Sequence, residues 1–241
     1  MPSLTAQTAV VTGASSGIGA AIALCLAEEG AKLHLIGRNA SALDEVAQRA
    51  RAHSPRVLTY RADLTVDEDL ANLQAVLKRD CDTLDILVHS AGVIAMATVE
   101  TASLSDFDRQ YRTNVRAPYA LTQALLPMLR AQQGSVVFIN SSAGMNTRAG
   151  ISQYSATKCA LKAVSDSLRA EVNADGIRVL SVYPGRTASP QQAAIHKAEG
   201  KAYSPELLMQ PTDVARIIVD ALKVNRTAEV TEINIRPMRK T

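Results

Sequence analysis

Thr12-Gly13-Ala14-Ser15-Ser16-Gly17-Ile18-Gly19 joins a short apolar run at residues 9–11 to a stretch rich in Ala and Leu that continues to Ala27. This pattern predicts a strand, a glycine-rich turn and a helix. Glycines permit the tight turn and let the backbone approach a phosphate closely, while the helix N-terminus offers amide donors and the positive end of its dipole. An ordinary glycine turn is the alternative. The strand before the turn and the helix after it favour a site for a pyrophosphate.

Beyond this turn, short apolar runs alternate with stretches of helical periodicity. The further runs lie at residues 32–36, 57–60, 84–88, 135–139, 177–182 and 230–235, and two of the helices are expected at residues 121–131 and 160–172. Strands that are apolar on both faces are typical of a parallel sheet with helices on each side. The alternation predicts an α/β fold, a doubly wound parallel sheet of about seven strands with helices on both faces.

The chain contains no evident linker, internal repeat or low-complexity tract. We therefore expect one domain over residues 1–241. The longest stretch without a clear helix or strand pattern is residues 184–210. Loops of that length are commonly functional, and we expect this one to be a substrate loop or lid.

Composition and charge argue against several kinds of partner. The net charge of +3 comes from 26 basic and 23 acidic residues that are spread along the chain, and only 3% of the residues are aromatic. Without basic runs or stacking platforms, nucleic acid is a poor candidate partner. The first four residues lead into no apolar signal segment, and no apolar run is long enough to span a membrane. We expect a cytoplasmic protein that does not bind membranes.

Cysteine and histidine show no arrangement that is typical of a metal site. The three cysteines and four histidines are scattered, and none has the spacing of a zinc-binding motif: Cys25, Cys81, Cys159, His34, His53, His89 and His196. A catalytic triad based on histidine is likewise not visible. We expect no metal ion.

The end of the second expected strand indicates which dinucleotide would bind. An acidic residue there binds the ribose hydroxyls of NAD, but Gly37 and then Arg38 occupy these positions. The missing carboxylate and the available guanidinium, which suits a phosphate, favour NADP(H) as the cofactor. The alternative is that Arg38 is a solvated residue at the start of a loop.

Tyr154-Ser155-Ala156-Thr157-Lys158 places a phenol and an ammonium group four residues apart, and so on one face of a helix. Ser141 follows the apolar run at residues 135–139 and adds a hydroxyl. A nearby cation favours the phenolate, so we expect Lys158 to lower the pKa of Tyr154 and to prepare it for proton transfer. The alternatives are a half-buried tyrosine with a solvated lysine, and a serine that only ends a strand.

Taken in order, the glycine turn, Asp63-Leu64, Ala91-Gly92, Asn114, Ser141, Tyr154-x-x-x-Lys158 and Pro184-Gly185 resemble the short-chain dehydrogenase/reductase family over about residues 8–185. The resemblance implies a single-domain Rossmann fold in which Asp63 and Leu64 lie near the adenine and Ala91 and Gly92 beside the cofactor. It also implies that Lys158 holds the nicotinamide ribose and that Asn114 supports a water between Lys158 and solvent. The family spacing selects Ser141 over Ser142.

From the motifs and the resemblance together, we expect catalysis by Ser141, Tyr154, Lys158 and Asn114. We expect the cofactor to be bound by Gly13, Ser15, Ser16, Gly17, Ile18, Gly19, Arg38, Asp63, Leu64, Ala91, Gly92, Tyr154, Lys158, Pro184 and Gly185. Two departures from the family pattern are His89-Ser90, where Asn-Asn is usual, and residues 233–237, where a glycine-rich ending is common. The resemblance implies a homodimer or a homotetramer.

The expected activity is the interconversion of a carbonyl and a secondary alcohol with NADP(H), with Tyr154 as general acid and base. A protein that binds NADP(H) without turnover, as a sensor, is the alternative. The substrate is open. Met145, Ile151 and Leu208 suggest an apolar pocket wall, and Arg148 or Arg186 is a candidate to receive a carboxylate or a phosphate, although either arginine is more often solvated.

Overall fold

The computed structural model describes residues 4–239, so the first three residues, on which part of the localisation argument rests, lie outside it. Its centre is one seven-stranded sheet in the order β3-β2-β1-β4-β5-β6-β7, and every neighbouring pair is parallel. The strands are β1 (Thr8–Thr12), β2 (Lys32–Gly37), β3 (Val57–Arg61), β4 (Ile86–His89), β5 (Ser135–Ile139), β6 (Arg178–Pro184) and β7 (Glu232–Ile235). The predicted doubly wound α/β fold is confirmed.

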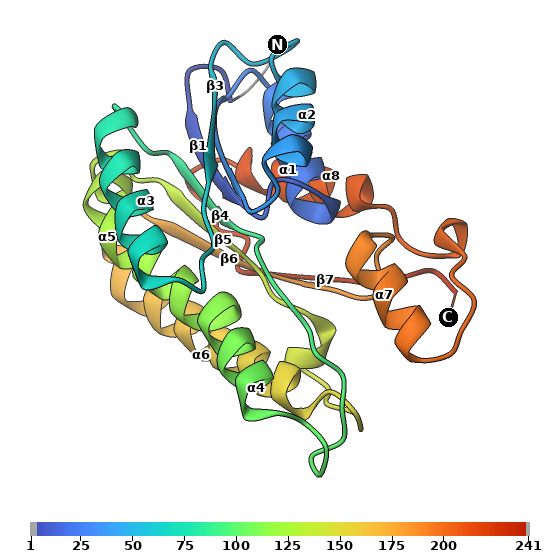
Figure 1. Cartoon of the computed structure of the whole chain (residues 1–241). Coiled ribbons are helices and arrows are strands. Elements are labelled where there is room, and N and C mark those ends of the chain that lie inside the picture. The colour runs from blue at the N-terminus through green and yellow to red at the C-terminus, as the bar shows by residue number, and fades with distance from the viewer. Residues whose placement is uncertain (1–3, 240–241) are drawn as a thin grey trace.

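Helices cover both faces of the sheet, as Figure 1 shows. One face is covered by α1 (Gly17–Glu28), α2 (Ala40–Ala50) and α8 (Pro211–Leu222). The other is covered by α3 (Asp67–Asp80), α5 (Ala117–Ala131) and α6 (Ser152–Val172), with α4 (Leu104–Tyr111) at its end. The remaining α-helix, α7 (Pro190–Ala198), stands to one side.

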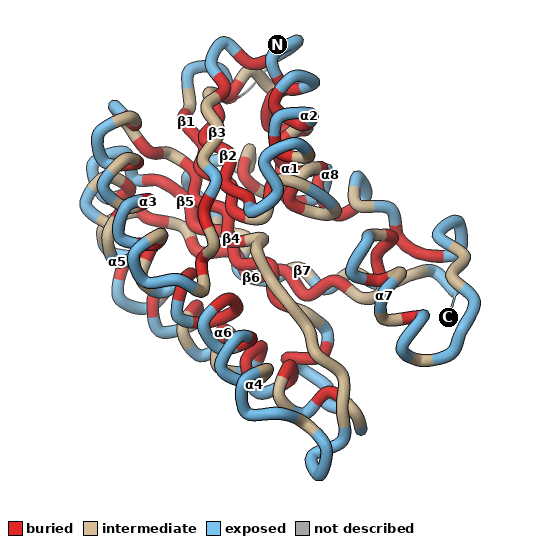
Figure 2. The backbone as a smooth tube through the Cα atoms, in the orientation of Figure 1, coloured by how far each residue is buried: buried red, intermediate tan, exposed pale blue. Residues whose placement is uncertain are grey.

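The interior strand β1 shows why the sheet needs two helical layers. All five of its residues are buried (Figure 2). Successive side chains point to opposite faces, so Ala9 and Val11 pack into the core beneath α1 and α8, while Val10 packs into the core beneath α3 and α5. Each large aliphatic side chain buried in this way contributes about 1.5–3 kcal/mol to folding.

The strand order determines where a ligand would bind. The chain runs outward from β1 through β2 to β3, and then returns to form β4 on the other side of β1. The connections that leave β1 and β4 therefore lead to opposite faces of the sheet, and ligands of open α/β sheets bind in the crevice at such a switch point.

The segment at residues 184–210 differs from the loop expected. It contains α7 and a single turn of 3-10 helix, Pro205–Leu207. The Ser189 hydroxyl accepts a hydrogen bond from the Gln192 amide at 3.1 Å, and Pro190 occupies the first helical position. Ser followed by Pro is a helix-start signal, so the sequence did contain evidence for α7.

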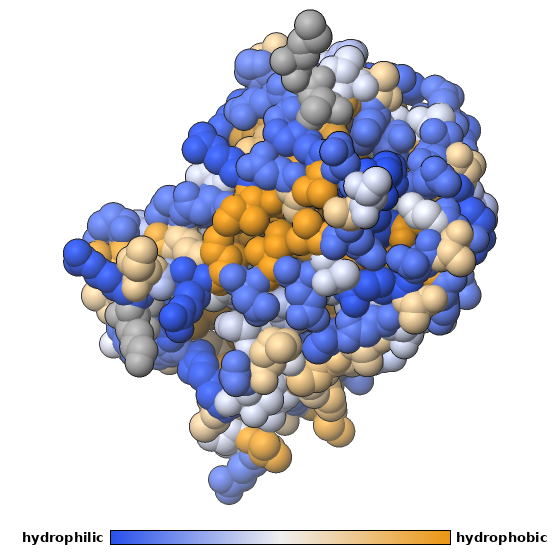
Figure 3. Space-filling view, turned by 180° about the vertical axis from the view of Figure 1, so that it is seen from behind, coloured by the Kyte–Doolittle hydropathy of each residue, from blue (hydrophilic) through white to orange (hydrophobic). Residues whose placement is uncertain are grey.

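The last strand leaves one edge of the sheet unpaired by another described strand. In β7, Ile233 and Ile235 are half-buried and pack against the core, whereas Glu232 and Asn234 are exposed. Figure 3 shows an apolar area surrounded by hydrophilic residues on the face opposite to that in Figure 1.

His89 ends β4 inside the molecule. Its Nε2 lies 2.8 Å from the Thr122 hydroxyl, and its ring stacks on Phe138. Among the described residues, Nδ1 has no hydrogen-bond partner. Burial lowers the pKa of His89 to about 3, so the imidazole is neutral in the folded protein.

Acid should therefore destabilise the fold through His89. In the unfolded chain a histidine takes up a proton near pH ~6.5, and between pH 7 and 5 this costs about 2 kcal/mol of the free energy of unfolding. We expect His89→Asn to lose about 2 kcal/mol less than the unmodified protein over that interval in urea unfolding experiments. His53→Asn is the control, because His53 is exposed. Equal losses in both variants would contradict the assignment.

Candidate active site

The glycine turn packs directly against the chain that follows β4. Gly13 has φ +68°, and a Cβ there would lie 2.7 Å from the Ala91 amide nitrogen. A Cβ at Gly19 would collide with the Gly13 carbonyl oxygen. Both positions therefore require glycine, as the sequence predicted.

Helix α1 begins inside this turn. Ser16 is its N-cap, and within the described chain the Ser16 side chain makes no capping hydrogen bond and the first turn holds no acidic residue. The amides at the start of the helix thus remain available to an anion. The turn and the helix start fit a pyrophosphate.

Thr12 fixes the turn to the neighbouring strand. Its hydroxyl accepts hydrogen bonds from the amides of Ser90 and Ala91 at 3.1 and 3.2 Å, and donates to the Val88 carbonyl at 3.3 Å. Ser90, which replaces an asparagine of the family pattern, is thus held through its backbone. Ala91 and Gly92 line the same pocket as the glycine turn, together with Pro184 and Gly185.

Two arginines line a second pocket at the other end of the crevice. Gly37, at the end of β2, pairs in register with Arg61 at the end of β3. Arg38 and Arg61 line one small pocket together with Asp63. The sequence singled out Arg38 but not Arg61, which is brought into place by the register of two strands that are separated by α2.

A side chain at position 37 would be crowded. A Cβ there would lie 3.2 Å from the Ser15 hydroxyl and 3.3 Å from a Leu43 methyl. The place where an acidic residue would stand therefore has little room for one.

Asp63 is held as a carboxylate. One of its oxygens accepts hydrogen bonds from the amide and the hydroxyl of Thr65, at 2.9 and 2.8 Å. Burial opposes ionisation, but these bonds and the charge of Arg38 outweigh it and lower the pKa of Asp63. Leu64 follows Asp63 and lines the main pocket.

Ser141, Tyr154 and Lys158 converge on the main pocket. Ser141 follows β5, and its hydroxyl accepts a hydrogen bond from the Ala143 amide at 3.1 Å. Tyr154 and Lys158 lie one turn apart on α6, and both are buried. The Lys158 ammonium group donates to the Ile139 carbonyl at 2.9 Å and lies 5.7 Å from the centre of the Tyr154 ring. Ser142 lines the pocket as well, but it is exposed.

The pKa of Tyr154 differs from the expectation. Burial raises it above the ordinary value, and a hydrogen bond with Ser141 only partly opposes this effect. Burial also lowers the pKa of Lys158 to about 8. The expected lowering of the tyrosine pKa by Lys158 is therefore not the net effect, because burial disfavours both charges.

Asn114 lies in a π-helical turn, Arg112–Arg116, between α4 and α5. Its side chain exchanges two hydrogen bonds with the backbone of Val93, each 2.9 Å long, and donates to the Thr157 hydroxyl at 3.0 Å. The side chain thus fixes the segment next to Gly92. The water expected beside Lys158 stays a prediction.

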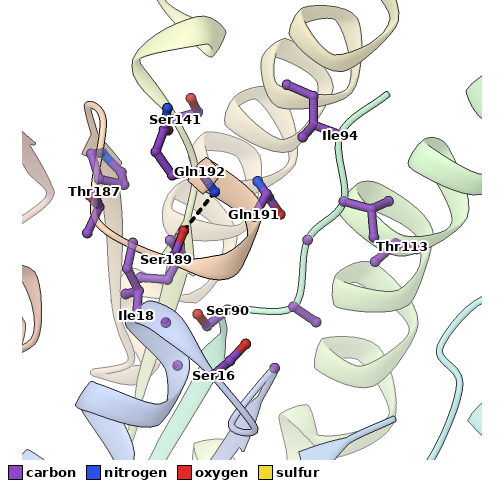
Figure 4. Close-up of a pocket in the computed structure, with 18 of the residues that line it drawn as sticks. Ser16, Ile18, Ser90, Ile94, Thr113, Ser141, Thr187, Ser189, Gln191 and Gln192 are labelled. Atoms are coloured by element: carbon purple, nitrogen blue, oxygen red, sulfur yellow. Dashed lines mark hydrogen bonds between the residues drawn. The ribbon is translucent and has the colours of Figure 1, made fainter. Parts of the chain in front are cut away.

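The main pocket has a volume of about 450 Å³ and also receives residues that the sequence analysis did not name individually. Figure 4 shows Ser189, Gln191 and Gln192 along one side of it, across from the segment with Ser90 and Ile94. The unassigned lining residues of this region are Ile94, Thr113, Thr187, Ser189, Gln191, Gln192 and Ile195. Five of them, Thr187, Ser189, Gln191, Gln192 and Ile195, lie in the segment 184–210 that was expected to be a substrate loop or lid.

The expected apolar wall is confirmed only in part. Ile151 lines the pocket and packs with Tyr154 and Ala143. Met145 and Leu208 are not among its lining residues: Met145 is exposed, and Leu208 is buried next to the turn at Pro205–Leu207. Arg148 and Arg186 both line the pocket.

This combination of a phosphate-binding turn and a Ser, Tyr and Lys site agrees with sequence comparison. The family described as short chain dehydrogenase matches residues 7–200. The chain belongs to the short-chain dehydrogenase family. An uncharacterised oxidoreductase from Staphylococcus aureus strain N315 is 33% identical over 239 residues, which cover 99% of this chain and 100% of that protein.

Solved structures of short-chain dehydrogenases agree with the fold. L-Sorbose reductase from Gluconobacter frateurii, in complex with NADPH and L-sorbose, superposes with a TM-score of 0.89 over 100% of both chains at 27% identity. A metagenomic short-chain oxidoreductase in complex with NADP has a TM-score of 0.84 and 29% identity, over 99% of this chain and 100% of that one. Among the described residues, no helix is long and apolar enough to cross a membrane.

The packing of the glycine turn generates a stability prediction. Gly13→Ala places a Cβ against the Ala91 backbone in a left-handed conformation, and should lower the free energy of unfolding by about 3 kcal/mol or more. Gly200→Ala is the matched control, because Gly200 has φ +65° and no heavy atom would lie within 4 Å of its Cβ. It should cost only about 1–2 kcal/mol in urea unfolding. Equal costs would show that the contact with Ala91 is unimportant.

Proposed function

We propose that this short-chain dehydrogenase interconverts a carbonyl and a secondary alcohol with NADP(H). The observation that carries the proposal is the single pocket that holds Ser141, Tyr154 and Lys158 together with the glycine turn. The NADPH and NADP complexes of the two structural relatives support the choice of cofactor.

The cofactor site follows from the crevice. The amides at the start of α1 would hold the pyrophosphate, and Arg38 with Arg61 would face the 2′-phosphate. Gly37 leaves little room for the carboxylate that would repel this phosphate. When bound, NADP(H) supplies or accepts the hydride.

The residues of the protein donate and accept the proton of the reaction. In reduction, Tyr154 donates its proton to the carbonyl oxygen as negative charge develops, and the Ser141 hydroxyl donates a hydrogen bond to the same oxygen. The raised pKa of Tyr154 keeps the phenol protonated at neutral pH, which suits this role. Lys158, with its pKa lowered to about 8, is able to exchange a proton near neutral pH. Alcohol oxidation reverses these steps.

The substrate end of the pocket lies beside the segment that contains α7. Residues 184–210, with α7, would cover the substrate end, since Gln191, Gln192 and Ile195 line the pocket. A homodimer or homotetramer and a cytoplasmic location stay predictions.

Tyr154→Phe tests the chemistry. Loss of the phenolic proton should reduce kcat for carbonyl reduction by about 10²–10⁴-fold, while the Kd for NADPH changes little. NADPH oxidation over a panel of ketones and aldehydes measures the first effect, and calorimetry measures the second. Tyr119→Phe is the control, because Tyr119 is exposed on α5. Turnover by Tyr154→Phe at the unmodified rate would refute the mechanism. NADPH binding without turnover by the unmodified protein would favour the sensor.

Cofactor preference tests the arginine pair. Arg38→Gln and Arg61→Gln should each weaken NADPH binding by about 10–100-fold, with a much smaller effect on NADH, because only NADPH carries the 2′-phosphate. Fluorescence titration with both nucleotides measures the ratio. Arg51→Gln serves as the control, since Arg51 is exposed at the end of α2. An unchanged ratio of NADPH to NADH affinity in the Arg38 variant would show that Arg38 does not bind the 2′-phosphate.

A further inference from the structure

Three cations surround one carboxylate at the substrate end of the pocket. Glu199 ends α7, and its side chain is only 9% exposed. Arg148 comes from the loop after β5, Arg186 follows β6, and Lys201 lies just beyond α7; their nitrogens are 2.9, 2.7 and 3.3 Å from the Glu199 carboxylate. The four groups leave two positive charges in excess.

The two arginines are not equally engaged. One terminal nitrogen of Arg186 donates to both carboxylate oxygens of Glu199, and the other lies 3.3 Å from the His196 Nε2. Arg148 donates through a single nitrogen, and its side chain is 50% exposed. Its remaining N–H groups have no partner among the described residues. Arg148 thus has donors to spare, while Glu199 fixes its guanidinium group.

Arg148 lines the same pocket as the residues proposed for catalysis. Arg148, Tyr154 and Ser141 all line it. Among the described lining residues, Asp63 is the only acidic one, and it lies near Arg38 at the other end. Ile151 and Ala143 pack beside Tyr154 and form an apolar surface at the catalytic end. A substrate in this pocket meets a proton donor, an aliphatic wall and a guanidinium group that has free N–H donors.

We propose that the substrate is a carboxylate-bearing carbonyl compound or its alcohol, that Arg148 binds the carboxylate, and that Glu199 positions Arg148. The inference rests on the proposed function and adds the substrate class. A carboxylate fits because the planar guanidinium group offers parallel donors to its two oxygens. The apolar wall suits an aliphatic segment between the carboxylate and the reacting carbon.

The charge state of Glu199 fits a permanent positioning role. Burial favours its neutral form, but the hydrogen bonds from Arg186, Arg148 and Lys201 outweigh burial and lower the pKa of Glu199 to about 2. The carboxylate therefore stays ionised throughout the neutral range, and Arg148 remains oriented before a substrate arrives.

The test uses 4-oxo acids of five to eight carbons, each paired with its methyl ester, and measures kcat/KM with NADPH. The unmodified protein should prefer the acids by about 10–100-fold, the usual effect of a hydrogen bond to a charged group. Arg148→Gln should abolish this acid-to-ester ratio, and Arg148→Lys should restore part of it. Arg130→Gln is the matched control: Arg130 is 49% exposed, pairs with Asp175 and lies on α5 away from the pocket. It should keep the ratio.

A second readout needs no turnover. Calorimetry with the NADP⁺-loaded protein should detect binding of saturated C5–C8 carboxylates but not of their amides, and Arg148→Gln should lose this difference. Glu199→Gln should raise KM for the acids more than it changes kcat, as expected of a positioning residue.

The outcomes separate the two proposals. Turnover of the esters at the same efficiency as the acids, or an acid-to-ester ratio that survives Arg148→Gln, would overturn the carboxylate assignment and leave the oxidoreductase intact. No NADPH oxidation with any carbonyl would refute the proposed function. Carboxylate binding that depends on Arg148 would still support the anion site in that case.

Discussion

The contact between Gly13 and the backbone of Ser90 and Ala91 is the constraint on which the site depends. A Cβ at Gly13 would lie within 2.9 Å of three backbone atoms there, so no other residue fits without a shift of the chain. Thr12 strengthens the contact with two hydrogen bonds to the same amides. The carboxyl ends of β1 and β4 are thereby joined at the switch point, and the phosphate-binding turn lies directly against the segment that leads to Gly92.

Polar side chains extend this contact to α6, the helix that contains Tyr154 and Lys158. Val93 follows Gly92 and is held by Asn114, which also donates to Thr157; the Thr157 hydroxyl in turn donates to the Tyr154 carbonyl at 2.8 Å. On the other side, Asn140 donates to the Lys158 carbonyl at 3.1 Å. Tyr154 and Lys158 are thus fixed through the backbone of α6, and both line the main pocket.

Local sequence patterns predicted the features that depend on residues near one another in the chain. The strands, the glycine turn and the residues Ser141, Tyr154 and Lys158 lie where expected, because apolar alternation and short motifs depend on near neighbours in the chain. The patterns missed Arg61, whose place depends on strand register. They did not single out Gln191 within the expected substrate loop, because the place of Gln191 depends on the fold of α7. They also gave the wrong direction for the pKa of Tyr154, because burial is a property of the assembled core.

Helix α7 extends between the two ends of the pocket. The sequence alone did not show that one helix reaches both. Its nine residues span about 13 Å. At its start, the Cβ of Ser189 would lie 3.3 Å from a Cβ at Gly17, in the phosphate-binding turn. At its end, Glu199 binds Arg148 and Arg186. One short helix therefore lies beside the phosphate-binding turn at its start and binds the arginines of the substrate end at its other end.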